Sequence, residues 1–227
     1  MMDAVFYLLD GGIKWRAMPA DFPPWDRVYA FWRRFRDRGW IAELHDRLRG
    51  AVREAAWRDP EPTAGIIDSP TVRSTPTVPG TTSGYDGGKR TVGRKRHLVC
   101  DVLGLVLAVL VTPADAGDRS AGQELLAKVA ARHHRHQADL GRCRLHRLPG
   151  RLVHHRAGTG AADRQAQRRR ERVSVLPRRW IIERTNAWIC RTRRLDRDYE
   201  RRCDSSEAMI YWSMVMLMTR RLARRPA

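Results

Sequence analysis

The sequence predicts an α/β fold, in which a small all-helical segment precedes a larger domain built from a mixed sheet with helices. Three observations predict it. Apolar residues recur at helical spacing between residues 25 and 52. Two runs of β-forming residues, 97–102 and 105–112, flank a Leu-Gly turn and indicate a hairpin. Helical patterns then return after residue 120 and again after residue 180.

The N-terminal helices are indicated by two apolar stripes. Pro23 and Pro24 suit the start of the first helix, because proline is tolerated in the first turn. Core packing is the simpler interpretation of both stripes. Their members are Val28, Phe31, Trp32 and Phe35, then Ile41, Leu44, Leu48 and Val52. The arginines on the other faces of the first helix could face solvent or DNA; they are Arg33, Arg34, Arg36 and Arg38.

The helical spacing of apolar residues stops at residues 59–62 (Asp-Pro-Glu-Pro), and this proline-rich stretch indicates a linker. It divides the chain into a helical segment over 1–58 and a domain over 63–227. Ile66 and Ile67 read as a short buried strand that ends in an acid, Asp68.

A Gly- and Thr-rich loop over 79–88 and a basic run over 89–96 lead from that strand to the hairpin. Ser120 and Gln123 form a possible capping box for the next helix. Near the C-terminus, residues 180–195 read as one helix with Glu183 near its start.

A last helix is expected after Asp204 and Glu207, which form another cap-like pair. It is rich in Met and Ile, and such a stripe is more often core than a ligand site. Its apolar stretch over 208–217 is too short for a membrane span. The N-terminus lacks a basic region followed by a long apolar stretch, so no signal peptide is expected.

The composition is strongly basic. The chain has 44 Lys and Arg against 25 Asp and Glu, a formal net charge of +19. This excess predicts a polyanionic partner, with nucleic acid as the first candidate. The four cysteines form no CxxC pair and no evident disulfide framework, which favours a reducing cytosol. Because neither a membrane span nor a signal peptide is expected, we predict a cytoplasmic protein with no membrane partner.

Several motifs in order resemble one family. Residues 14–19 (KWRAMP), 21–25 (DFPPW) and 28–29 (VY) resemble the N-terminal segment of bacterial insertion-sequence transposases of the IS-five family. Residues 66–69 (IIDS), 84–89 (GYDGGK) and 93–97 (GRKRH) resemble its first catalytic block. Residues 175–185 (VLPRRWIIERT), 187–188 (AW), 198–200 (DYE) and 205–211 (SSEAMIY) resemble its last. The resemblance covers residues 1–131 and 173–227.

The resemblance implies a ribonuclease-H-like domain of the DDE class, in which three carboxylates bind two Mg²⁺ or Mn²⁺ ions. Two such ions activate the attacking oxygen and stabilise the leaving one in phosphoryl transfer. By carry-over, Asp68 is the first metal ligand and Glu183 the last. The implied partner is double-stranded DNA, at the transposon ends and at the target, and a homo-oligomer is expected. The residues expected to contact DNA are Lys89, Arg94, Lys95, Arg96, Arg179, Arg184 and Arg191.

The family's second catalytic block, a strand reading Trp-Ala-Asp followed by Gly-Tyr, is absent. Residues 132–172, where it should lie, are rich in Arg and His and contain no Ile, Met, Phe, Trp or Tyr. A buried strand is not expected from that composition, so this stretch is predicted to be disordered or irregular. Asp139 and Asp163 are poor substitutes for the missing ligand, because neither has a strand-like context. The spacing of His133, His134, His136 and Cys143 fits no common zinc pattern.

A shifted reading frame explains the gap. When residues 140–147 are re-read one nucleotide along, the genetic code permits Trp-Ala-Asp-Ala-Gly-Tyr-Thr-Gly, which is the missing block. The frame returns before residue 175, so two compensating insertions or deletions are inferred, near residue 132 and near residues 168–172. The N-terminal segment is also expected to be truncated relative to the family. The chain is therefore predicted to be a degenerate, inactive transposase. The alternatives are a basic DNA-binding protein with no catalytic ancestry and an RNA-binding protein.

Overall fold

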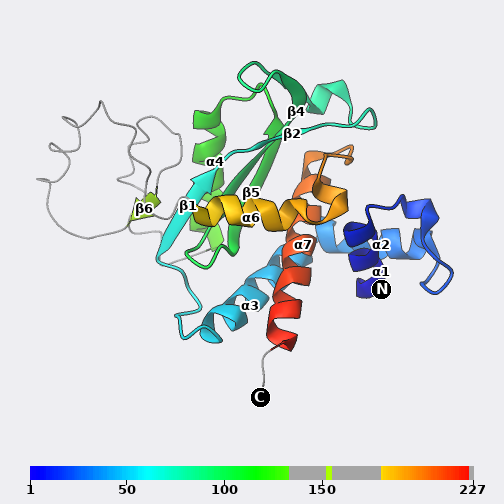
Figure 1. The fold of residues 1–227 in the computed structure, drawn as a ribbon, viewed down its shortest axis with the longest axis horizontal. Helices are drawn as coiled ribbons and strands as arrows, with labels where there is room; N and C mark the ends of the chain where they lie inside the picture. The colour runs from blue at the N-terminus through cyan, green and yellow to red at the C-terminus, as the bar shows by residue number, and fades with distance from the viewer. Residues whose placement is uncertain (133–151, 155–179, 225–227) are drawn as a thin grey trace, which may run out of the picture.

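The computed structural model describes residues 1–132, 152–154 and 180–224. Figure 1 shows a sheet with α4 on one side and α6 crossing the other, while the N-terminal helices gather around α7. The α/β class predicted from the sequence is confirmed.

The N-terminal part is helical, as predicted. It contains α1 (Met2–Gly11), the 3₁₀ turn η1 (Trp15–Ala17), α2 (Trp25–Asp37) and α3 (Trp40–Glu54). α1 ends at Gly12, whose φ of 66° is left-handed and suits glycine. Both expected stripes face inward: Val28, Trp32, Ile41 and Val52 are buried.

The sheet is built around one long strand, β4 (Thr91–Cys100). β4 pairs antiparallel with β1 (Ala64–Asp68), β2 (Thr71–Arg73), β3 (Gly84–Asp86) and β5 (Val106–Pro113). β4 and β5 form the predicted hairpin. The register places Asp68 opposite Leu98. β6 (Leu152–His154) pairs antiparallel with the first part of β1, so three residues of the stretch expected to be irregular form a short strand.

The two faces of the sheet bury different helices. On one face α4 (Asp118–Arg132) packs Leu125 and Val129 against Ile67, Val99 and Leu107. The other face carries α6 (Trp180–Cys190) and α7 (Cys203–Ala223), with the short turn η5 (Arg193–Leu195) between them. α7 also packs against the N-terminal helices, so one hydrophobic core joins the two regions. No helix in the described part of the chain is long and apolar enough to cross a bilayer.

Three local expectations are wrong. The helix expected over 180–195 ends at Cys190. Ser120 lies inside α4 rather than at its cap, and its hydroxyl donates to the carbonyl of Gly117. Asp204 and Glu207 do not cap α7, whose N-cap is Arg202 without a side-chain hydrogen bond. These acids serve other partners instead: Asp204 pairs with Arg202, and Glu207 accepts hydrogen bonds from Lys128 and the amide of Val111.

Candidate functional site

Asp68 lies at the last position of β1, as the sequence predicted. Its side chain is half-buried, and its Oδ2 accepts a hydrogen bond of 3.0 Å from Nδ2 of Asn186 on α6. This bond joins two segments separated by 118 residues in the sequence. The first predicted carboxylate therefore faces the helix that carries the second.

Glu183 is exposed and stands in the first turn of α6, three residues before Asn186. Residues three apart on a helix are neighbours, with Cβ atoms roughly 5–6 Å apart. Glu183 therefore stands about one helical turn before the residue that contacts the Asp68 carboxylate. The structure thus brings Asp68 and Glu183 to the same end of β1.

α6 is fixed in place by its buried face. Ile181, Ile182 and Ile189 enter the core, and the Thr185 hydroxyl donates to the carbonyl of Gly104 at 2.8 Å. Gly104 has a φ of +79°, and a Cβ there would meet Thr185 Oγ1 at 2.8 Å. The hairpin turn therefore accepts α6 only because a glycine lies beneath it.

A polar chain that the sequence analysis did not single out lies beside Asp68. The hydroxyl of Ser69 is 2.7 Å from Nδ1 of His97, and Nε2 of His97 is 2.9 Å from Oγ1 of Thr112. Burial lowers the pKa of His97 to about 4, so its imidazole is neutral at pH 7. This chain holds the residue after Asp68 against the hairpin.

The fit to a pair of divalent metal ions is incomplete. Carboxylates are suitable ligands for Mg²⁺. Among the described residues, however, no group of three or more His, Cys, Asp or Glu side chains could hold a metal ion. Of the three carboxylates that the resemblance implies, the described residues include the two candidates Asp68 and Glu183. Asp139, Asp163, the histidine cluster with Cys143, and Arg179 all lie outside the described residues.

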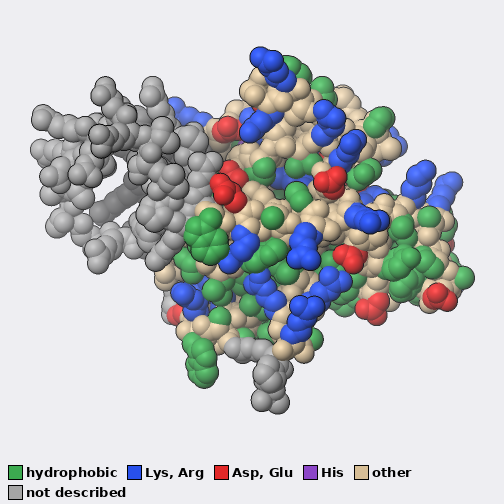
Figure 2. Space-filling model, in the orientation of Figure 1, with side chains coloured by type: hydrophobic (Ala, Val, Ile, Leu, Met, Phe, Trp, Pro, Cys, Tyr) green, Lys and Arg blue, Asp and Glu red, His purple; other side chains and the backbone are tan. Residues whose placement is uncertain are grey.

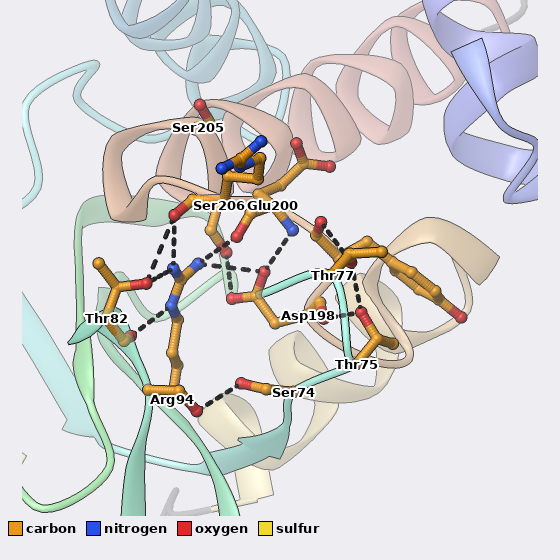
Figure 3. Close-up of polar contacts among 12 residues, drawn as sticks. Ser74, Thr75, Thr77, Thr82, Arg94, Asp198, Glu200, Ser205 and Ser206 are labelled. Carbon is orange, nitrogen blue, oxygen red and sulfur yellow. Dashed lines mark hydrogen bonds and ion pairs between the residues drawn. The ribbon is translucent and has the colours of Figure 1, made fainter. Parts of the chain in front are cut away.

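The basic residues expected to contact DNA fall into two groups. Arg94 is fully buried, and Figure 3 shows its guanidinium surrounded by acceptors. It donates to the carbonyl and hydroxyl of Thr82 at 2.7 and 2.5 Å and to the Glu200 carbonyl at 2.8 Å. Its Nη1 lies 3.4 Å from Oδ1 of buried Asp198. Arg94 therefore holds the segment before α7 against β4.

Arg96 has the same kind of role. It is 2% exposed and donates to the carbonyl of Leu195 at 2.7 Å. The placement of Arg94 and Arg96 in a DNA interface is thus corrected: their guanidinium groups are inside the protein and bound to it. Residues 198–200, part of the matched motif, are what Arg94 holds.

Lys89, Lys95, Arg184 and Arg191 remain accessible in whole or in part. Lys89 and Arg191 are exposed. Lys95 points to the opposite face of β4 from Arg94, where Nζ donates to the Ala116 carbonyl at 3.0 Å and pairs with Asp118 at 2.7 Å. Arg184 lies against the rings of Trp180 and Trp188.

Two family models match the chain. Residues 59–218 match the model described as a transposase DDE domain. Residues 1–45 match the model described as a putative transposase of the IS4/5 family. Comparisons with curated proteins and with solved structures gave no match. The match to the transposase DDE domain spans most of the chain, from the start of the sheet into α7. The arrangement of sheet and helices agrees with the expected ribonuclease-H-like domain.

Proposed function

The chain belongs to the DDE transposase family, and on that premise we propose that it is a DNA transposase in which Asp68 and Glu183 are the remaining acids of a phosphoryl-transfer site. The observation that carries the assignment is the 3.0 Å bond from Asn186 to Asp68. It places the helix of Glu183 over the end of β1, although the two acids lie far apart in the sequence.

In this proposal each described residue has a limited task. Asp68 and Glu183 would hold divalent cations, Mg²⁺ or Mn²⁺, which supply activation of the attacking oxygen and stabilisation of the leaving one when bound. Asn186 orients the carboxylate of Asp68, and the Ser69–His97 pair fixes the backbone after it. Lys89, Lys95 and Arg191 are placed on the surface, where they can contact phosphates.

We further propose that this copy is degenerate. The described residues offer two acids where the family uses three, and the sequence lacks the Trp-Ala-Asp block. The chain is then expected to bind double-stranded DNA, as a homo-oligomer, without cutting or joining strands. The alternative is a basic DNA-binding protein in which Asp68 and Asn186 are only a structural tie.

The experiment restores the frame. The gene is repaired so that residues 140–147 become Trp-Ala-Asp-Ala-Gly-Tyr-Thr-Gly, and the product is incubated with supercoiled plasmid that carries the DNA flanking the gene. Nicking that needs Mg²⁺ or Mn²⁺ is expected from the repaired protein and not from the original chain. The matched control is the repaired protein with Asp68→Asn, which keeps the bond to Asn186 possible while removing a metal ligand.

The two functions differ in outcome. If a soluble, folded repaired protein makes no nicks, the catalytic assignment fails and the non-catalytic alternative stands. If Asp68→Asn and Glu183→Gln nick as well as their parent, the assignment of these two acids is wrong. Accurate sequencing of the gene across codons 128–176 is the first step, because it shows whether the one-base shift encodes the block at all.

A further inference from the structure

One face of α6 carries a basic surface that the two acids do not use. Arg184, Trp188 and Arg191 follow one another at four and three residues, so they form a stripe along the helix. Asn186, which bonds Asp68, lies on the other side of Glu183 from this stripe when the helix is viewed down its axis. The stripe therefore borders Glu183 on the side away from Asp68.

Two arginines are held against one indole ring there. The guanidinium carbon of Arg184 lies 4.6 Å from the ring centroid of Trp188, and that of Arg221, from α7, lies 4.3 Å from it. Arg184 also lies 4.7 Å from the ring of Trp180 and donates to the carbonyl of Leu103 at 3.0 Å. These contacts fix both cations before any ligand arrives, which reduces the entropy lost on binding.

Among the described residues the charges of these two cations are only weakly offset by acids. In the ranges that the structure describes, no carboxylate lies within ion-pairing distance of Arg184 or Arg221, and the nearby Asp101 is already paired with Arg53. Burial and the charge of Arg184 lower the pKa of Arg221, and the opposing effect of Asp101 is smaller. Nε of Arg184 is buried without a hydrogen-bond partner. Two neighbouring cations in this condition favour an anion between them.

The surface is hollowed along the same line. One hollow of about 440 Å³ is lined by Arg184, Trp188 and Arg221, with Leu103 at its side. A second, of about 430 Å³, shares Trp188 and Arg221 with the first. Its further basic residues are Arg191, Arg220 and Arg224. Figure 2 shows Lys and Arg side chains gathered with hydrophobic ones on the face formed by α6 and α7.

We infer that these two hollows form an arginine groove, defined by Arg184, Arg191, Arg220, Arg221 and Arg224, that binds the phosphodiester backbone of DNA. The inference rests on the proposed function and adds to it a contact surface on α7. Five arginines line the groove against one acid, Asp10, which lies 3.6 Å from Arg220. Backbone rather than base recognition follows because the Trp188 ring is already covered by guanidinium groups.

A third hollow adjoins the groove beside α1. The next hollow along α1 shares Asp10, Arg191 and Arg220 with the second one, and there Asp3 joins the lining. Arg193 lines it as well, so three arginines stand against two acids and the basic surface continues toward α1. Contacts of this kind position DNA without reading its sequence.

The test measures the salt dependence of DNA binding by the full chain. Fluorescence anisotropy of a labelled duplex is recorded over a range of salt concentrations for the wild type and for Arg221→Gln and Arg224→Gln. Each lost phosphate contact should reduce the slope of log K against log salt by about 0.9. Arg47→Gln is the matched control, because it removes the same charge from an exposed residue of α3 that pairs with Glu43.

We expect both groove variants to bind DNA more weakly and to show a shallower slope of log K against log salt, while Arg47→Gln keeps the wild-type slope. Arg224 is exposed and is not among the DNA contacts expected from the sequence, so Arg224→Gln tests the groove even if Arg221→Gln fails to fold. The inference that the groove binds DNA is wrong if the wild type binds DNA and the groove variants have the same affinity and salt slope as Arg47→Gln. If the wild type binds no DNA at all, the proposed function fails with it. Inorganic phosphate, added at constant ionic strength, should not displace the duplex. If it does, the hollow is a binding site for a single phosphate ion rather than for a DNA backbone.

Discussion

Replacement of Arg94 by methionine should cost folding stability rather than DNA affinity. The substitution keeps much of the side-chain volume but removes the charge that faces Asp198. Asp198 would keep its bonds from the amide of Glu200 and the hydroxyl of Ser206, while its charge stays buried without a cation. Breaking a buried pair by removing one partner costs about 3–5 kcal/mol. The carbonyl groups of Thr82 and Glu200 would also lose their donor.

For a chain of this size the midpoint of thermal unfolding moves by roughly 2–4 °C per kcal/mol, so Arg94→Met should lower it by roughly 6–20 °C. Circular dichroism during heating measures this. Adding Asp198→Asn removes the uncompensated charge and should recover about 2 kcal/mol, as expected for residues that are in contact. Lys89→Met is the control: Lys89 is exposed, and its loss should change stability by less than about 0.5 kcal/mol.

The result that would refute this reasoning is specific. If Arg94→Met melts with the wild type but loses about one phosphate contact in the salt dependence of DNA binding, Arg94 belongs to the DNA interface after all. If Asp198→Asn fails to rescue it while both proteins stay folded, the pairing of Arg94 with Asp198 contributes little, and the bonds to Thr82 and Glu200 account for the loss.

Two further predictions concern stability. The pKa of His97 is about 4 when folded against 6.5 when unfolded, so the unfolded state binds the extra proton between these values. The stabilisation that His97 contributes is therefore complete above pH 6.5, and it falls by on the order of 3 kcal/mol as the pH drops to 4. Urea unfolding at several pH values should show that His97→Asn loses less free energy of unfolding than the wild type over this range. Equal losses in the two proteins would contradict the prediction. Gly104→Ala places a Cβ 2.8 Å from Thr185 Oγ1 and 2.9 Å from Trp188 at a φ of +79°. It should cost roughly 3 kcal/mol by urea unfolding, whereas Gly87→Ala, where nothing lies within 4 Å, should cost little.

The parts of the fold that the sequence predicted are those with a clear period. The stripe through Val28 and Trp32, the acid-ended strand at Asp68 and the hairpin after it all follow from apolar spacing. β2 and β3 were missed because each is three residues long and depends on β4 for its hydrogen bonds. Such short strands carry too few residues to show alternation.

The misplacement of Arg94 and Arg96 has a physical cause. Successive side chains of a strand point to opposite faces, so Arg94 and Arg96 share a face with Leu98 and Cys100, and Lys95 takes the other. Leu98 and Cys100 lie in the core beneath α7. The alternation was therefore visible in the sequence. What it could not supply was the set of acceptors around residues 195–201, because they come from a segment about a hundred residues away.

The open side of β1 connects the missing block to the site. β4 occupies one side of β1, and β6 pairs on the other from Ala64 to Ile66 only. Among the described strands none pairs with Asp68 on that second side. A restored strand bearing the Trp-Ala-Asp block would have to reach Asp68 there to bring a third carboxylate beside it and Glu183. Asn186 holds Asp68 toward α6, so under the proposed function a third carboxylate is expected to join Asp68 and Glu183 from this open side of β1.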